Sequence, residues 1–190
     1  GKMGYAIARQ CAQRGADTIL ISGPTQLTIN HPRVKLIKVE SAQEMYLAAT
    51  ENFARCDAAI LSAAVADFTP MQKADTKIKR EKGEQVITLQ PTHDIAATLG
   101  QQKTDKQKLV GFALETNDEQ HNAQQKLLKK NLDFIVLNSL RDKGAGFNVD
   151  TNKITIINRS GETTNYPLKN KDEVANDIVN TLTSLWEQQK

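Results

Sequence analysis

Short apolar runs alternate with helical segments along the whole chain, and this order constrains the fold more than any other feature. Strands are predicted at 18–21, 34–39, 58–62, 109–113 and 133–137. Helices are predicted at 1–14, 41–53, 94–99, 118–130 and from 170 onward. Strands that alternate with helices favour a mainly parallel sheet covered on both faces. We therefore expect an α/β protein with a Rossmann-like three-layer fold.

Polar residues predict where three of these helices begin. Ser41 and Glu44 have the spacing of a capping box. Thr92 is predicted to cap the short helix that follows it. Asn170 with Glu173 is predicted to open the last helix.

Two hairpins are expected to add antiparallel strands to the parallel sheet. One would pair 77–80 with 86–90, and the other would pair 153–157 with 163–166. Ligands of parallel sheets bind beyond the carboxyl ends of the strands. The loops expected at this edge follow Ile21, Leu61, Phe112 and Leu137.

Composition excludes several classes of protein. The chain has 190 residues, a length that fits one domain, so residues 1–190 are expected to form a single domain. Its net charge of +3 is too balanced for a general nucleic-acid coat, and we expect no nucleic-acid partner. No apolar run approaches the roughly 20 residues that a membrane span needs, so no membrane partner is expected.

The cysteines and histidines suggest neither a disulfide framework nor a structural zinc site. Cys11 and Cys56 are far apart and are interpreted as buried thiols in a reducing compartment, which places the protein in the cytoplasm. The spacing of His31, His93 and His121 does not match that of zinc ligands.

Residues 63–80, AAVADFTPMQKADTKIKR, contain the strongest functional signal. Small residues end a strand and are followed by one carboxylate, Asp67. The basic side chains that follow are Lys73, Lys77, Lys79 and Arg80. An acid at a strand end beside a basic loop is suited to a phosphate-rich ligand with its metal ion. Taken alone, Asp67 is also compatible with a turn cap, and Lys77 with a protected edge strand.

Three further patterns have both a structural and a functional interpretation. Gly1 and Gly4 resemble a glycine-rich turn that lets a helix N-terminus approach phosphate, or allow close helix–sheet packing. Lys126 and Lys130 share one helix face, where lysines also complement the helix dipole. Phe112 is placed either to stack on a base or to fill the core.

Taken in order, these segments resemble the phosphopantothenate–cysteine ligase (phosphopantothenoylcysteine synthetase) domain, the C-terminal half of a bifunctional coenzyme A biosynthesis protein in most bacteria. The landmarks are GKMGYAIA at 1–8, RGAD at 14–17, LISGP at 20–24, AAVADF at 63–68, KIKR at 77–80, HDI at 93–95, VGFALET at 110–116, KLLKKNLDFIVLN at 126–138 and GAGFNVDTN at 144–152. Together they cover almost the whole chain. The resemblance implies that 4′-phosphopantothenate is activated by CTP as an acyl-cytidylate, and that cysteine then displaces CMP.

The resemblance also implies roles for individual residues. Lys77 would lie on a flap and stabilise the transition state, and Asp67 would contact the nucleotide, with Mg²⁺ as the metal ion. The other nucleotide-binding residues that it implies are Leu61, Ser62, Ala63, His93, Asp94, Ile95, Ala96, Phe112, Lys126 and Lys130. The metal ligands are not assigned. A homodimer with the Lys77 loop near the interface is expected.

The sequence also departs from the family pattern. In the family, an Asn that handles the acyl intermediate and a Ser-Ser-Gly turn precede the GKMG landmark, and only Gly1 of that turn is present here. We therefore expect the chain to be the C-terminal part of a longer protein, without the upstream flavin decarboxylase domain and hence without flavin. His93 stands where the family often has proline.

Two other functions are compatible with parts of the pattern. One is an NAD(P)-dependent oxidoreductase on a Rossmann-like sheet, although no acid is clearly placed at the end of the second strand to bind a ribose. The other is a non-catalytic nucleotide-binding module.

Overall fold

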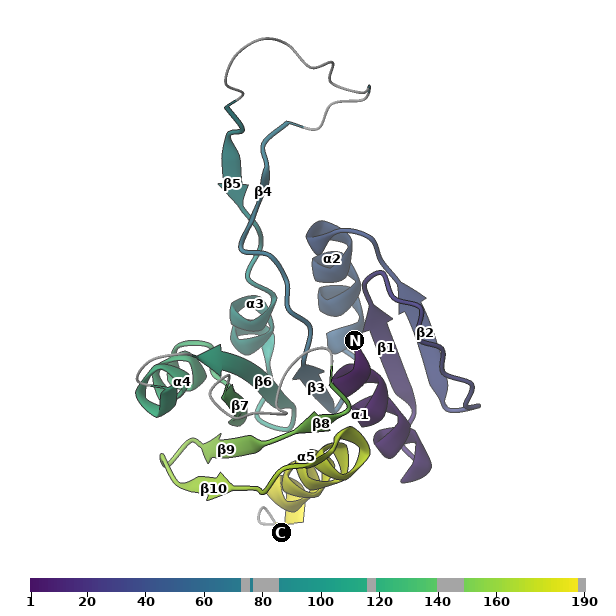
Figure 1. Ribbon diagram of the computed structural model, residues 1–190, viewed down its shortest axis with the longest axis vertical. Coiled ribbons are helices and arrows are strands. Elements are labelled where there is room, and N and C mark those ends of the chain that lie inside the picture. The colour runs from purple at the N-terminus through teal and green to yellow at the C-terminus, as the bar shows by residue number, and fades with distance from the viewer. Residues whose placement is uncertain (73–75, 77–85, 116–118, 140–148, 188–190) are drawn as a thin grey trace.

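The computed structural model describes residues 1–72, 76, 86–115, 119–139 and 149–187. Within them, the largest sheet has the strand order β10–β9–β7–β6–β3 (Figure 1). Strands β3 (Ala58–Leu61), β6 (Lys108–Glu115) and β7 (Phe134–Ser139) are parallel. Strands β9 (Ile154–Asn158) and β10 (Thr163–Asn165) extend the sheet in antiparallel fashion. The predicted α/β fold with a mainly parallel central sheet is confirmed.

A second, smaller sheet consists of two parallel strands, β1 (Thr18–Ser22) and β2 (Val34–Lys38). Within the described residues, β1 pairs only with β2, and β3 pairs only with β6. The side chains of β3 and most of those of β1 are only partly buried. Parallel strands are usually covered on both faces and paired along their edges. Within the described residues, β1 and β3 therefore each have one edge without a paired strand.

Helices cover both faces of the five-stranded sheet. Helices α1 (Lys2–Gln13) and α5 (Lys171–Glu187) pack on each other and contribute to one core cluster. Helices α2 (Ala42–Phe53), α3 (Ile95–Gln102) and α4 (Glu119–Lys129) contribute to the other. This arrangement gives the predicted three layers.

Strand β7 shows how the sheet separates the two cores. Phe134 and Val136 belong to the cluster with α1 and α5. Ile135 and Leu137, the alternate residues, belong to the cluster with α2, α3 and α4. Successive side chains of a strand point to opposite faces, so a continuous apolar run is what a strand buried on both faces requires.

Two of the three predicted helix starts are confirmed. The N–H of Glu44 donates to Ser41 Oγ at 3.2 Å, as in the predicted capping box. At the start of α5, the N–H of Glu173 donates to Asn170 Oδ1 at 2.9 Å, and Glu173 Oε2 accepts the N–H of Asn170 at 3.1 Å.

The predicted cap of α3 is wrong. Asp94, not Thr92, is the N-cap, and its Oδ1 accepts the N–H of Ala97 at 3.0 Å. The Thr92 hydroxyl instead donates to the carbonyl of Ala66 at 2.6 Å. Both residue types cap helices well, and the tertiary bond to the preceding loop decides between them.

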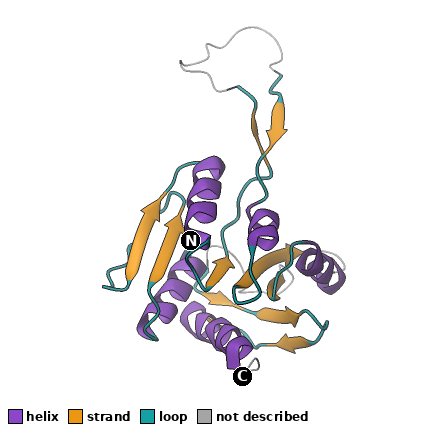
Figure 2. Ribbon diagram, turned by 180° about the vertical axis from the view of Figure 1, so that it is seen from behind, coloured by secondary structure: helices purple, strands orange, loops and turns teal. Residues whose placement is uncertain are grey.

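Of the two predicted hairpins, the one formed by β9 and β10 is confirmed. The other differs from its prediction, because β5 (Leu89–Pro91) pairs with β4 (Phe68–Pro70). The predicted strand at 77–80 lies outside the described residues. Strands β4 and β5 form an arm that projects from the body (Figure 2). Two short strands, β8 (Thr151–Asn152) and β11 (Lys169–Asn170), form a further antiparallel pair.

Candidate functional site

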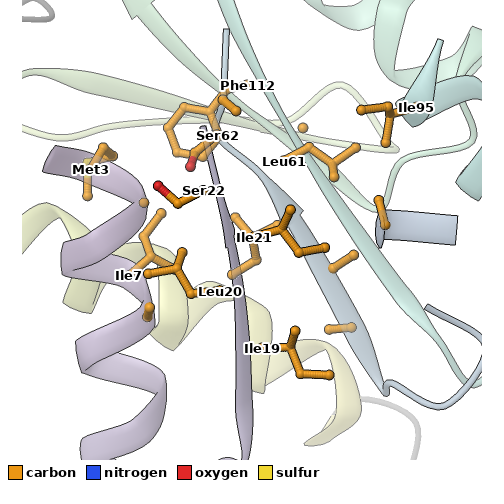
Figure 3. A pocket seen from close by; sticks show the side chains of 18 of the residues that line it. Met3, Ile7, Ile19, Leu20, Ile21, Ser22, Leu61, Ser62, Ile95 and Phe112 are labelled. Atoms are coloured by element: carbon orange, nitrogen blue, oxygen red, sulfur yellow. The ribbon is translucent and has the colours of Figure 1, made fainter. Parts of the chain in front are cut away.

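A cavity of about 1890 Å³ lies between β1 and β3 and extends to the loop after β3, to Leu114 of β6 and to Asn138 of β7. Apolar side chains of β1 and α1 line part of it, among them Ile21 and Ile7 (Figure 3). Ser22, Ser62 and Phe112 lie together at its other end (Figure 3). Ser22 and Ser62 thus lie where ligands of parallel sheets bind. Charged residues also line the cavity near the amino ends of β1 and β3, among them Arg14, Asp17 and Asp57.

The start of α1 packs closely against the end of β3. A Cβ atom built on Gly4 would lie 3.0 Å from Ser62 Oγ, closer than side-chain atoms normally approach. Gly4 therefore has the packing role that its sequence pattern allowed. It also brings the N-terminus of α1 to the edge of the cavity, so the packing and phosphate-approach interpretations are compatible.

The loop after β3 is held by its backbone. Thr92 donates its N–H to the carbonyl of Asp67 at 2.9 Å, and its hydroxyl bonds to the carbonyl of Ala66. The Asp67 side chain is exposed and lines the cavity, and no described side chain forms a hydrogen bond or ion pair with it. Its carboxylate is therefore placed at the cavity and open to a ligand.

The N-terminus of α3 carries a capped and paired carboxylate. Lys130 Nζ lies 3.0 Å from Asp94 Oδ2, in addition to the helix-capping bond of Asp94. Burial tends to raise the pKa of Asp94, but the N–H of Ala97 and the Lys130 ammonium outweigh burial and hold the pKa below its ordinary value. Asp94 is therefore ionised at neutral pH and fixes Lys130 beside the first turn of the helix.

The ring of His93 stacks on Tyr46 of α2, with centroids 4.5 Å apart and planes 23° from parallel. Phe112 packs against the core cluster of α1 and α5 and also lines the cavity, so its core role is observed and its stacking on a base stays a prediction. Lys126 is exposed and lines the cavity one turn before Lys130.

The predicted site residues within the described residues all line this one cavity. They are Leu61, Ser62, Ala63, Asp67, His93, Asp94, Ile95, Ala96, Phe112, Lys126 and Lys130. They come from segments up to about 70 residues apart in sequence, and the fold brings them together. Their individual roles stay predictions, and Lys77 lies outside the described residues.

Sequence reasoning missed a polar group on the far wall of the cavity. Asn152 donates its side-chain N–H to Asn138 Oδ1 at 2.9 Å, and both residues line the cavity. Lys171 is buried there and donates to the carbonyl of Val149. Burial, followed by the nearby charge of Lys2, lowers the pKa of Lys171. Both asparagines lie in segments that resemble the family, Asn138 in 126–138 and Asn152 in 144–152. This resemblance could have identified them as candidate site residues.

The two cysteines are less buried than predicted. Cys11 and Cys56 are free thiols of intermediate exposure. Burial raises the pKa of both thiols, so neither is activated as a thiolate at neutral pH.

Comparison with known proteins identifies the family. The family model described as "DNA/pantothenate metabolism flavoprotein C-terminal domain" matches residues 1–185. This chain belongs to that family. The Coenzyme A biosynthesis bifunctional protein CoaBC of Bacillus subtilis (strain 168) is 43% identical over 188 residues, which are 99% of this chain and 46% of that protein. A protein named "Cysteine/Cysteine sulfinic acid decarboxylase", from an unknown prokaryotic organism, is 54% identical over 97% of this chain and 52% of its own length.

Two solved structures have a similar fold. The crystal structure of the C-terminal domain of CoaBC is 39% identical, with a TM-score of 0.80, and the match covers 99% of this chain and 84% of that one. A structure named "Cab2 mutant H337A complex with phosphopantothenate-cysteine" has a TM-score of 0.73 at 15% identity, over 100% of this chain and 80% of that one, and supports the fold alone.

The chain spans about half the length of the curated relatives from this family. The activities in their names therefore belong to proteins about twice as long. Among the described residues, no helix is long and apolar enough to cross a membrane.

Proposed function

We propose that this domain is a phosphopantothenate–cysteine ligase (EC 6.3.2.5) that activates its acyl substrate with CTP and acts in coenzyme A biosynthesis. The observation that carries the proposal is the single cavity in which the described nucleotide-site residues meet. Relatives named CoaBC match the domain over nearly its whole length, which supports the same assignment.

The proposed reaction has two steps. The carboxylate of 4′-phosphopantothenate attacks the α-phosphorus of CTP, the bond to the bridging oxygen breaks, and pyrophosphate leaves. The amine of cysteine then attacks the acyl carbon of the acyl-cytidylate, CMP leaves, and the amine loses a proton. Both substrates of the first step are anions, so fixed positive charge and oriented N–H groups are what the protein has to supply.

The described residues provide these features. Lys126 and Lys130 line the cavity, and so does the first turn of α3, where the positive end of the helix dipole is capped by Asp94. Asp94 holds Lys130 in place through their ion pair. Lys77, in the segment between the arm strands, is assigned transition-state stabilisation on the basis of the family resemblance alone.

A magnesium ion brought in by the nucleotide fits this donor set. Among the described residues, no three His, Cys, Asp or Glu side chains gather at one point, as a protein-built metal cage would require. Mg²⁺ is typically held by one or two carboxylates together with substrate phosphates. The open carboxylate of Asp67 would serve as that ligand, and the ion would neutralise charge on the phosphates.

The arm supports the proposal of a homodimer. Its exposed apolar side chains include Val86, which is 90% exposed, and Ile87, which is 70% exposed. An isolated two-stranded ribbon is marginally stable in water, and apolar side chains gathered on it favour a partner. We propose a second copy of the chain as that partner. The double substitution Val86→Ser with Ile87→Ser is then expected to give a monomer by sedimentation velocity, and an unchanged sedimentation coefficient would contradict the dimer.

The nucleotide site is tested by ligand-dependent thermal stabilisation of the full-length protein. CTP with Mg²⁺ is expected to raise the melting temperature, and Lys130→Met is expected to reduce this rise. Lys129→Met is the matched control, because Lys129 is the exposed last residue of α4, directly before Lys130, and does not line the cavity. Stabilisation by NADPH but not by CTP would instead favour an oxidoreductase.

The relative named as a decarboxylase raises a second candidate, an accessory domain of a cysteine decarboxylase. Only about half of that relative is matched, so its name does not locate the decarboxylation in this domain. Release of CO₂ from cysteine without CTP would support this candidate. CTP-dependent pyrophosphate release would support the ligase.

A further inference from the structure

Thr92, His93 and Asp94, at the base of the arm, each contact a different part of the molecule. Thr92 bonds to the backbone of Ala66 and Asp67, in the loop after β3. Asp94 caps α3 and pairs with Lys130, just beyond the end of α4. His93, between them, is stacked on an aromatic ring from α2.

The stacked ring belongs to Tyr46, which is partly buried, whereas His93 is exposed. Further along the two helices, Phe53 of α2 and Leu99 of α3 lie in the same core cluster. Helices α2 and α3 are thus associated at two places, in the core cluster that contains Phe53 and Leu99 and at the aromatic stack of Tyr46 on His93, just before α3. Aromatic pairs at this separation are attractive beyond the area they bury.

This stack matters because of what α2 connects. Helix α2 packs on β1, and within the described residues no backbone ladder joins the β1–β2 sheet to the five-stranded sheet. Side-chain contacts must therefore hold α2 against the start of α3 across the cavity. His93 is followed directly by Asp94, Ile95 and Ala96, which line the proposed nucleotide site.

We propose that Tyr46 is a positioning residue for the nucleotide site, acting through His93. By stacking on His93, Tyr46 fixes the start of α3, and with it the helix N–H groups and the Asp94–Lys130 pair that face the nucleotide. The inference deepens the proposed function and rests on it for its kinetic test. It assigns a role in nucleotide binding to a residue that does not itself line the cavity.

The kinetic test uses two substitutions at one position in the full-length protein. Tyr46→Phe retains an aromatic ring and is expected to keep the wild-type KM for CTP. Tyr46→Leu removes the stack but leaves an apolar side chain, and is expected to raise the KM for CTP roughly five- to tenfold with kcat changed by less than about twofold. A melting temperature is recorded for both, so that loss of folding is recognised.

A spectroscopic test does not depend on turnover. The Tyr46 ring shifts the NMR signals of the His93 ring protons, so Tyr46→Phe should retain this shift and Tyr46→Leu should abolish it. The backbone amide signals of Ile95 and Ala96 should move in Tyr46→Leu alone. His93→Leu, which also removes a residue that lines the cavity, should raise the KM for CTP at least as much as Tyr46→Leu does, and the double variant should be no worse than His93→Leu alone.

The outcomes separate the two proposals. An unchanged KM for CTP in folded Tyr46→Leu would overturn the positioning role, and so would equal effects of Leu and Phe. If the wild-type protein shows no CTP-dependent turnover, the proposed function fails. The amide signals then decide the positioning role, because unmoved Ile95 and Ala96 signals in Tyr46→Leu would overturn it.

Discussion

Replacing Asp94 by alanine removes two interactions at the start of α3 at once. The helix loses its N-cap bond to Ala97, which is typically worth about 1 kcal/mol. The ion pair with Lys130 is lost as well. The side chain of Lys130 is 28% exposed, and that of Asp94 is 49% exposed. At that exposure solvent screening limits the pair to about 0.5 kcal/mol. We expect Asp94→Ala to lower the free energy of unfolding by about 1.5 kcal/mol, or the melting temperature by about 3–6 °C.

Asp94→Asn separates these two contributions. Asparagine caps a helix about as well as aspartate but carries no charge, so Asp94→Asn should cost about 0.5 kcal/mol. Urea unfolding of both variants and the wild type, analysed with a common slope, measures the differences. Equal destabilisation by Asn and Ala would show that the cap contributes nothing, and no destabilisation by either would refute the reasoning altogether.

The pH dependence of the same variants provides an independent check. The pKa of Asp94 is lowered in the folded state from its ordinary value of 3.8. A lowered carboxyl pKa stabilises the fold fully above the unfolded-state pKa, and this contribution is lost as the pH falls through the folded-state pKa. The difference in free energy of unfolding between the wild type and Asp94→Asn should therefore have its full value at about pH 6 and decrease towards about pH 3. An advantage that grows on acidification would contradict the assignment.

Three further substitutions test the packing around the site by urea unfolding. A Cβ on Gly100 would lie 2.0 Å from the carbonyl oxygen of Lys130, so Gly100→Ala should destabilise by about 3 kcal/mol, and a neutral effect would refute the close contact. Asp133→Ala leaves Lys103, whose side chain is 8% exposed, without its partner, and should cost about 3–5 kcal/mol unless the lysine reaches water. Ile135→Ala should cost about 2–5 kcal/mol, because Ile135 is fully buried in the core, and a smaller loss would mean that the core collapses around the gap.

Local sequence patterns predicted the layers of the fold, because each pattern that indicates a helix or a strand lies within that one helix or strand. A strand was predicted at 133–137 in a sheet expected to be covered on both faces, and the two core clusters on either side of β7 confirm it. The Ser41–Glu44 capping box is likewise complete within four residues and was predicted correctly. Thr92 and Asp94 are both good caps, and a bond to Ala66, 26 positions away, decided which one caps.

The site was predicted only where a family landmark marked it. Asp67 and Lys130 were singled out on residue type and resemblance, and the fold places both at one cavity. The stack of Tyr46 on His93 joins residues 47 positions apart that share no sequence pattern, so only the tertiary structure shows it. The division of the parallel strands between two sheets was also absent from the sequence signal, because strand propensity does not specify which edges pair.

The most direct test of the central claim is pyrophosphate release by the full-length protein that contains this chain. With CTP, Mg²⁺ and 4′-phosphopantothenate but without cysteine, we expect release of pyrophosphate, and Asp67→Asn should lower its rate while Asp105→Asn, an exposed control, should not. Addition of cysteine should then release CMP and form phosphopantothenoylcysteine. Pyrophosphate release that does not require 4′-phosphopantothenate, or none with CTP under any of these conditions, would contradict the account.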